Sequence, residues 1–159
     1  MIAADIQNGL NEQINEEYCS WYFYRAAADY CHELNLTGFS KWLRHRSDKK
    51  LGQANRLADF VLERHGHVEA RGIELANGHW DSPQAVLDSA LERERHLSQS
   101  VSGLTTLSLQ QGDHATHDLL ERFASEQAEA EASVERIRTR LQLMSESPTG
   151  LYIFDRALA

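Results

Sequence analysis

Apolar residues recur every three or four positions through four long stretches of this 159-residue chain. On an α-helix this spacing gathers them on one face, which can be buried against other helices. Only two prolines occur, at the beginning of the third stretch and near the C-terminus, where they interrupt no helix. The pattern predicts long helices over residues 4–34, 38–65, 83–111 and 114–146, and no strand. The expected fold class is therefore all-α.

Residues that favour helix ends lie between these stretches. Thr37, Ser82 and Asp113 each carry a side-chain oxygen that can accept a hydrogen bond from the first turn of the helix that follows. Pro83 suits the first position of the third helix, and Gly112 suits its end. Thr37, Ser82 and Asp113 are the predicted N-caps of the second, third and fourth helices.

Two connections of different length predict how the helices are arranged. Residues 35–37 form so short a link that the first two helices should be antiparallel. The sixteen residues 66–81 can span ~53 Å, enough to return along a ~45 Å bundle and start the third helix parallel to the second. After Pro148 the tail predicts a short fifth helix. The expected architecture is a four-helix bundle with one long crossover, formed by residues 1–159 as one domain.

The charge balance limits the partners. A net charge of −8 without a basic tail argues against nucleic acid and anionic membranes, and would suit cations. The N-terminus has no basic region followed by an apolar run, and no stretch reaches the ~18 apolar residues of a membrane span. We therefore expect a cytoplasmic protein. Cys19 and Cys31, ~18 Å apart on one helix, should remain free thiols.

Polar residues interrupt the apolar face of each predicted helix near mid-length. A heptad frame places these side chains toward the core: Glu17, Lys50, Gln53, Glu94 and Gln127. A buried carboxylate requires a cation or a metal as partner. One interpretation is a metal site, since carboxylates from several helices bind two iron ions in the middle of some bundles. The other is an ion-pair layer with Lys50 between Glu17 and Glu94. Its hydrogen-bonding members would be Gln53, Gln127 and Tyr24.

Several motifs resemble those of the bacterial non-haem ferritins. They are LNEQINEEY with Tyr24 after it, ERERH around Glu94, SEQAEAE around Gln127, and GLYIFDRAL near the end. The resemblance covers nearly the whole chain and includes the long crossover and the short fifth helix. It implies a hollow shell of twenty-four subunits that stores iron as a ferric mineral.

The resemblance also implies roles for individual residues. Glu17 matches the first iron ligand of the family, Tyr24 the tyrosine beside its di-iron centre, and Glu94 a ligand of its second site. Three residues match fourth-helix positions that face the centre and an adjoining third iron site: Glu126, Gln127 and Glu129.

The second helix departs from the family pattern. Ferritins have Glu-Glu-x-x-His where this chain has Lys49, Lys50 and Gln53, and a glutamate where it has Ala130. Two Fe(II) ions need several carboxylates, whereas two carboxylates with one lysine give a net charge of about −1. The departure therefore implies no intact ferroxidase centre. Lys50 would replace the metal, which resembles the solution in the ferritin light chain of animals.

Three functions remain open at this point. The leading one is a ferritin shell subunit that stores or mineralises iron without fast oxidation of its own, alone or mixed with competent subunits. Another is a slow ferroxidase that uses Glu17, Glu94 and the fourth-helix glutamates. The third is a shell of ferritin architecture whose polar layer is purely structural. The missing ligands weigh against an enzyme without excluding one.

Outside the polar layer, Glu126 and Glu129 share a face of the fourth helix. By the resemblance, they could line the inner cavity near Lys49 and help to bind or nucleate iron. The alternative is a solvated face that is paired with Lys49. Both interpretations stay open on the sequence alone.

The histidines give one further candidate. His114 and His117 lie one turn apart in a region that borders the threefold pores of ferritins, where such a pair can bind a metal or simply lie on the surface. A haem of the bacterioferritin type would need an axial methionine on the second helix. The only methionines are Met1 and Met144, so we expect no haem.

Overall fold

The computed structural model describes residues 1–75 and 78–159 and has five helices in these ranges. Their bounds are Ala4–Glu33 for α1, Thr37–Glu63 for α2, Pro83–Gln110 for α3, His114–Met144 for α4 and Pro148–Leu158 for α5. No strand occurs in the described part of the chain. The predicted all-α fold is confirmed, and the ends of the four long helices lie within two residues of the predicted ones.

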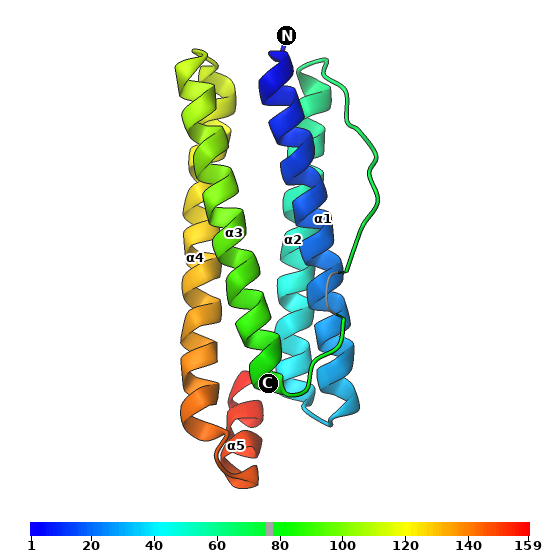
Figure 1. Cartoon of the computed structure of the whole chain (residues 1–159), viewed down its shortest axis with the longest axis vertical. Coiled ribbons are helices and arrows are strands. Elements are labelled where there is room, and N and C mark those ends of the chain that lie inside the picture. The colour runs from blue at the N-terminus through cyan, green and yellow to red at the C-terminus, as the bar shows by residue number, and fades with distance from the viewer. Residues whose placement is uncertain (76–77) are drawn as a thin grey trace.

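Figure 1 shows α1 and α2 as one antiparallel pair, with α3 and α4 as a second pair beside it. Residues 66–75 run along the outside of the bundle from the end of α2, and α3 begins at the opposite end, so α3 runs parallel to α2 (Figure 1). The short helix α5 lies at that end and contacts α2 and α4. This is the predicted bundle with one long crossover. None of the described helices has the length and apolar character needed to cross a membrane.

Two of the three predicted N-caps are present. Ser82 Oγ accepts a hydrogen bond from Ala85 N at 3.1 Å, and Asp113 Oδ1 accepts one from Thr116 N at 3.1 Å. Gly112 has a φ of 70°, a left-handed conformation that glycine adopts without steric penalty. These signals are readable in the sequence because every partner lies within one helical turn.

The N-terminus of α2 is capped differently from the prediction. Thr37 lies inside the helix, Leu36 occupies the cap position, and its side chain makes no capping bond. Instead, the buried Asp155 of α5 accepts a hydrogen bond from Phe39 N at 2.8 Å. Its negative charge also suits the positive end of the helix dipole. The acceptor expected from Thr37 is thus provided by a distant helix.

Gly38 allows α5 to approach this helix end. A Cβ at residue 38 would lie 2.0 Å from Asp155 O, whereas a Cβ at Gly103 in α3 would meet nothing within 4 Å. We expect Gly38→Ala to lower the free energy of unfolding by about 1–3 kcal/mol, because the docked helix must shift. Gly103→Ala is the matched control and should raise it by about 0.5–1 kcal/mol. Chemical unfolding followed by circular dichroism measures both, and equal changes would contradict this account.

Two apolar clusters fill the bundle, one toward each end. The residues of the first that approach the middle are Phe23, Leu43, Leu91 and Val134, and those of the second are Ile14, Leu57, Val101 and Phe123. Between the two clusters, every long helix carries at least one buried polar or charged side chain. A polar layer therefore divides the core near mid-length.

Candidate functional site

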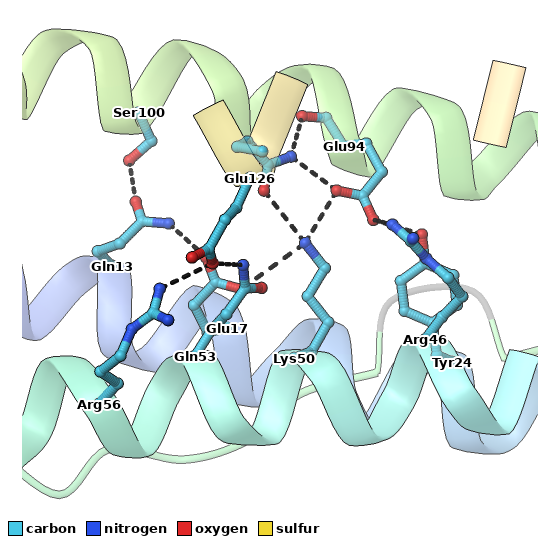
Figure 2. Close-up of polar contacts among 11 residues, drawn as sticks. Gln13, Glu17, Tyr24, Arg46, Lys50, Gln53, Arg56, Glu94, Ser100 and Glu126 are labelled. Carbon is cyan, nitrogen blue, oxygen red and sulfur yellow. Dashed lines mark hydrogen bonds and ion pairs between the residues drawn. The ribbon is translucent and has the colours of Figure 1, made fainter. Parts of the chain in front are cut away.

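Lys50 lies at the centre of the polar layer. Its Nζ is 2.9 Å from Glu94 Oε2 and 3.8 Å from Glu17 Oε2, and it donates a hydrogen bond to Gln127 Oε1 at 3.2 Å (Figure 2). The four residues come from four different helices, and each is no more than 1% exposed. Because water is excluded, these charges interact more strongly than they would at the surface.

Glu94 is the best satisfied carboxylate of the layer. Its Oε1 accepts a hydrogen bond from the Tyr24 hydroxyl at 2.5 Å, and its Oε2 accepts one from Gln127 Nε2 at 2.7 Å. Burial alone raises the pKa of Glu94, but the charge of Lys50 and the hydrogen bonds from Tyr24 and Lys50 outweigh it, so the pKa is lowered. Burial and the charge of Glu94 raise the pKa of Tyr24 well above its usual value. At neutral pH, Glu94 is ionised and Tyr24 is a neutral donor.

Glu17 is less completely satisfied. Its Oε1 accepts a hydrogen bond from Gln13 Nε2 at 2.8 Å, and Ser100 Oγ donates to Gln13 Oε1 at 2.7 Å. Its Oε2 has no hydrogen-bond partner within residues 1–75 and 78–159. Burial raises the pKa of Glu17 by more than Lys50 lowers it. Gln13 was not predicted as a member of the layer. Its position four residues before Glu17 could have indicated the hydrogen bond, because side chains four residues apart are neighbours on a helix.

Arg46 adds a second buried cation that was not predicted as a site residue. It is 5% exposed, and its Nη2 lies 3.6 Å from Glu94 Oε1. The sequence could have indicated its burial, because Arg46 lies on the inward heptad face one turn before Lys50. Two cations therefore face two carboxylates, Glu17 and Glu94. The layer is balanced in charge when both are ionised, and not negative as the count from the sequence suggested.

Gln53 lies outside this buried group, contrary to the prediction. It is partly exposed, and its Nε2 donates to Oε2 of the exposed Glu126 at 3.3 Å (Figure 2). Arg56 Nη2 donates to the same oxygen at 2.7 Å. Burial raises the pKa of Glu126, but the hydrogen bonds from Arg56 and Gln53 outweigh it and lower the pKa overall. Glu126 thus belongs to a separate polar group at the surface of the bundle.

Lys49 and Glu129 lie near this surface group. Glu129 Oε1 accepts a hydrogen bond from Arg136 Nη2 at 3.0 Å. Lys49 is exposed and makes no ion pair in the described part of the chain. Both residues line one open cavity together with Glu126 and Ala130. Arginines, and not Lys49, are therefore the ion-pair partners of the two fourth-helix glutamates.

The two candidate pore histidines have separate surroundings. His114 is exposed at the start of α4. His117 Nε2 lies 3.4 Å from Glu121 Oε1, and its Nδ1 lies 3.4 Å from Thr105 O. Across residues 1–75 and 78–159, no group of three or more His, Cys, Asp or Glu side chains is arranged to hold a metal ion. The pore role of the two histidines stays a prediction.

Residues 7–144 match the protein-family model described as a ferritin-like domain. The chain belongs to the ferritin family. A bacterial non-heme ferritin of Bacteroides fragilis is 30% identical over 158 residues, which cover 99% of this chain and 98% of that protein. One of Campylobacter jejuni is 28% identical over 156 residues, covering 98% and 93%. The family resemblance seen in the sequence motifs is confirmed.

Solved ferritin structures share the fold of this family member. An open-pore ferritin from the hyperthermophilic archaeon Archaeoglobus fulgidus matches with a TM-score of 0.95 and 34% identity, covering 99% of this chain and 96% of that one. A humanized archaeal ferritin matches with a TM-score of 0.96 and 33% identity over the same shares of the two chains. The backbone is therefore that of a ferritin along nearly its whole length.

Proposed function

We propose that this ferritin-family chain is a subunit of an iron-storing shell in which an ion-paired layer replaces the di-iron centre. The supporting observation is the position of Lys50 Nζ, 2.9 Å from Glu94 Oε2 and 3.8 Å from Glu17 Oε2. By the family resemblance, these two glutamates correspond to iron ligands. The ammonium group occupies the space between them.

An iron ion that entered this space would meet unfavourable electrostatics. Oxidation of paired Fe(II) ions requires several anionic ligands around both ions. Here Lys50 and Arg46 already neutralise the two carboxylates, and Gln127 uses its amide to bind Glu94. Displacing Lys50 would leave a buried ammonium without a partner, which is costly. The residues present do not fit a di-iron centre.

Storage also requires a cavity and a surface on which mineral can form. We infer that copies of the chain assemble into a hollow shell, alone or mixed with ferritin subunits that have an intact centre. Glu126 and Glu129 are exposed on α4 and are the carboxylates most accessible to iron in solution among the matched positions. Iron is the substrate and the stored product of this shell, and not a resident cofactor of the subunit.

Aerobic addition of Fe(II) to the metal-free protein tests this function. We expect oxidation at the rate of a protein-free control, followed by growth of ferric absorbance as mineral forms, because the layer holds no pair of iron ions. Rapid oxidation that saturates at about two irons per subunit would refute the proposed loss of the centre. Slow but saturable oxidation would favour a weak ferroxidase that uses the remaining glutamates.

Gel filtration of the same preparation provides the structural control. We expect a large particle that still carries iron after loading. A stable monomer or dimer would count against the shell. A large particle that retains no iron would favour an interaction scaffold whose polar layer is purely structural.

A further inference from the structure

The C-terminal helix α5 is docked on the bundle through a small face. All eleven of its residues are described, and two of them are buried, Phe154 and Asp155. The Phe154 ring meets the Phe39 ring of α2 edge-on, with 5.7 Å between the ring centroids. Asp155 Oδ1 accepts the hydrogen bond from Phe39 N at 2.8 Å. Leu151 and Leu158 add partly buried contacts with the same apolar cluster.

The other side of α5 faces solvent at the end of the bundle (Figure 1). Tyr152 is 61% exposed and Ile153 is 51% exposed, so these two large apolar side chains add little to the docking. A helix of eleven residues is also too short to be stable on its own in water. Segments with few buried apolar groups open at a lower free energy than the core of a domain. The helix α5 is such a segment.

A sealed thiol lies beside the docked helix. Cys31, near the end of α1, is 0% exposed and belongs to the same apolar cluster as Phe39 and Phe154. Burial raises the pKa of the Cys31 thiol to about 12, and the negative charge of Asp155 acts in the same direction. Such an effect requires that the two side chains lie close together. A thiol reagent needs both access and a thiolate, and the docked state provides neither.

We propose that α5 is a lid that opens while the four long helices stay folded, and that Cys31 reacts with thiol reagents only in this open state. Opening breaks the contacts of Phe154 and Asp155 with α2 and moves the Asp155 charge away from the thiol. The pKa of Cys31 then returns toward the ordinary thiol value of ~8.5. The polar layer and the second apolar cluster lie away from α5 and can stay intact. The lid depends on the docking of α5 within one subunit and not on iron storage, so it stands apart from the function proposed above.

Alkylation of the whole chain with N-ethylmaleimide in increasing urea tests this lid. The thiolate sulfur adds to the double bond of the reagent, a proton from water completes the adduct, and mass spectrometry of peptides separates Cys31 from Cys19. We expect the rate of Cys31 labelling to be nearly constant at low urea, because opening of α5 exposes little surface, and to rise steeply only where the bundle unfolds. A steep rise from zero urea, or no labelling of Cys31 before the bundle unfolds, would overturn the proposal.

Two variants of α5 separate its inner face from its outer face. Phe154→Ala should speed the labelling of Cys31 at least about tenfold without urea, because the docking face loses its largest apolar group. Asp155 stays in place, so the charge near the thiol is unchanged while the lid is closed. Ile153→Ala is the matched control, since it removes an exposed apolar side chain of the same helix and should leave the rate unchanged. Equal rates in the two variants would contradict the lid.

A second pair of variants acts from outside α5. Gly38→Ala places a Cβ against Asp155 O and should also speed the labelling of Cys31 at least about tenfold. Gly103→Ala, where a Cβ meets nothing within 4 Å, should leave the rate unchanged. Far-UV circular dichroism shows whether the bundle is still folded in each variant. Folded Gly38→Ala protein that labels no faster than Gly103→Ala would count against a lid as well.

Discussion

Replacing Lys50 with methionine is expected to lower the free energy of unfolding by about 3–5 kcal/mol near pH 7. The change removes the cation that lies 2.9 Å from Glu94 Oε2 and leaves two buried carboxylates with only Arg46 nearby. Methionine has a similar volume to lysine, so the loss reports on charge and not on packing. Chemical unfolding followed by circular dichroism measures the difference.

The exposed Lys41 of the same helix provides the matched control for this variant. Lys41→Met should change the free energy of unfolding by no more than about 0.5 kcal/mol, because the residue lies at the surface. A similar loss in both variants, or a loss below about 1 kcal/mol in Lys50→Met, would show that the buried ion pairs contribute little.

The loss in Lys50→Met should become smaller in acid. The lowered pKa of Glu94 stabilises the native protein above the pKa of the unfolded carboxyl, and this contribution is lost as the pH falls through the native pKa. The raised pKa of Glu17 affects stability in the opposite direction, since its contribution is present below the unfolded pKa and lost as the pH rises through the native pKa.

In the variant, both carboxyls should protonate more readily, because Lys50 is the strongest influence that lowers the pKa of either Glu17 or Glu94. The difference from wild type should therefore be smaller at about pH 5 than at about pH 7, and a constant difference would argue against uncompensated carboxylates.

The helices and their order could be predicted because the signals that set them are local. Ser82 and Gly112 act within one turn of the residues whose conformation they affect. Thr37 is equally suited to cap a helix locally, but the acceptor for Phe39 N is Asp155, which lies 116 positions after Phe39 along the chain. Its arrival depends on the docking of α5, and no pattern within α2 contains that information.

The polar layer could be predicted in part, because heptad spacing indicates which positions of each helix face the core of the bundle. It placed four residues toward the core that are all buried: Glu17, Lys50, Glu94 and Gln127. The inward face of a straight α-helix rotates by ~20° per heptad relative to an exact seven-residue repeat. Gln53 therefore lies at the edge of that face, where its side chain binds Glu126. The long side chain of Arg46 could reach either solvent or Glu94, and spacing does not decide between them. The charge balance of the layer therefore became visible only in the folded structure.

Changing Lys50 to glutamate and Gln53 to histidine is expected to accelerate Fe(II) oxidation at least about tenfold over the wild-type protein. The double variant would leave three carboxylates and one arginine in the buried layer and would place an imidazole at residue 53, at the edge of the layer beside Glu126. Arg46 remains beside Glu94, so we expect the first iron to bind near Glu17, whose Oε2 has no hydrogen-bond partner in the described residues. Ferric absorbance after aerobic addition of Fe(II) measures the rate.

Zn(II), which undergoes no oxidation, gives this double variant a readout that does not depend on catalysis. Without a metal, its buried carboxylates repel one another, so a dication that binds the native state should raise its melting temperature. The wild-type protein should show no such rise, because Lys50 already compensates Glu94 at 2.9 Å. Lys41→Glu introduces a carboxylate at an exposed position of α2 and should behave like wild type in both measurements. If the double variant folds but neither oxidises iron faster nor gains stability from Zn(II), Lys50 does not replace a metal, and the polar layer serves only to join the four helices.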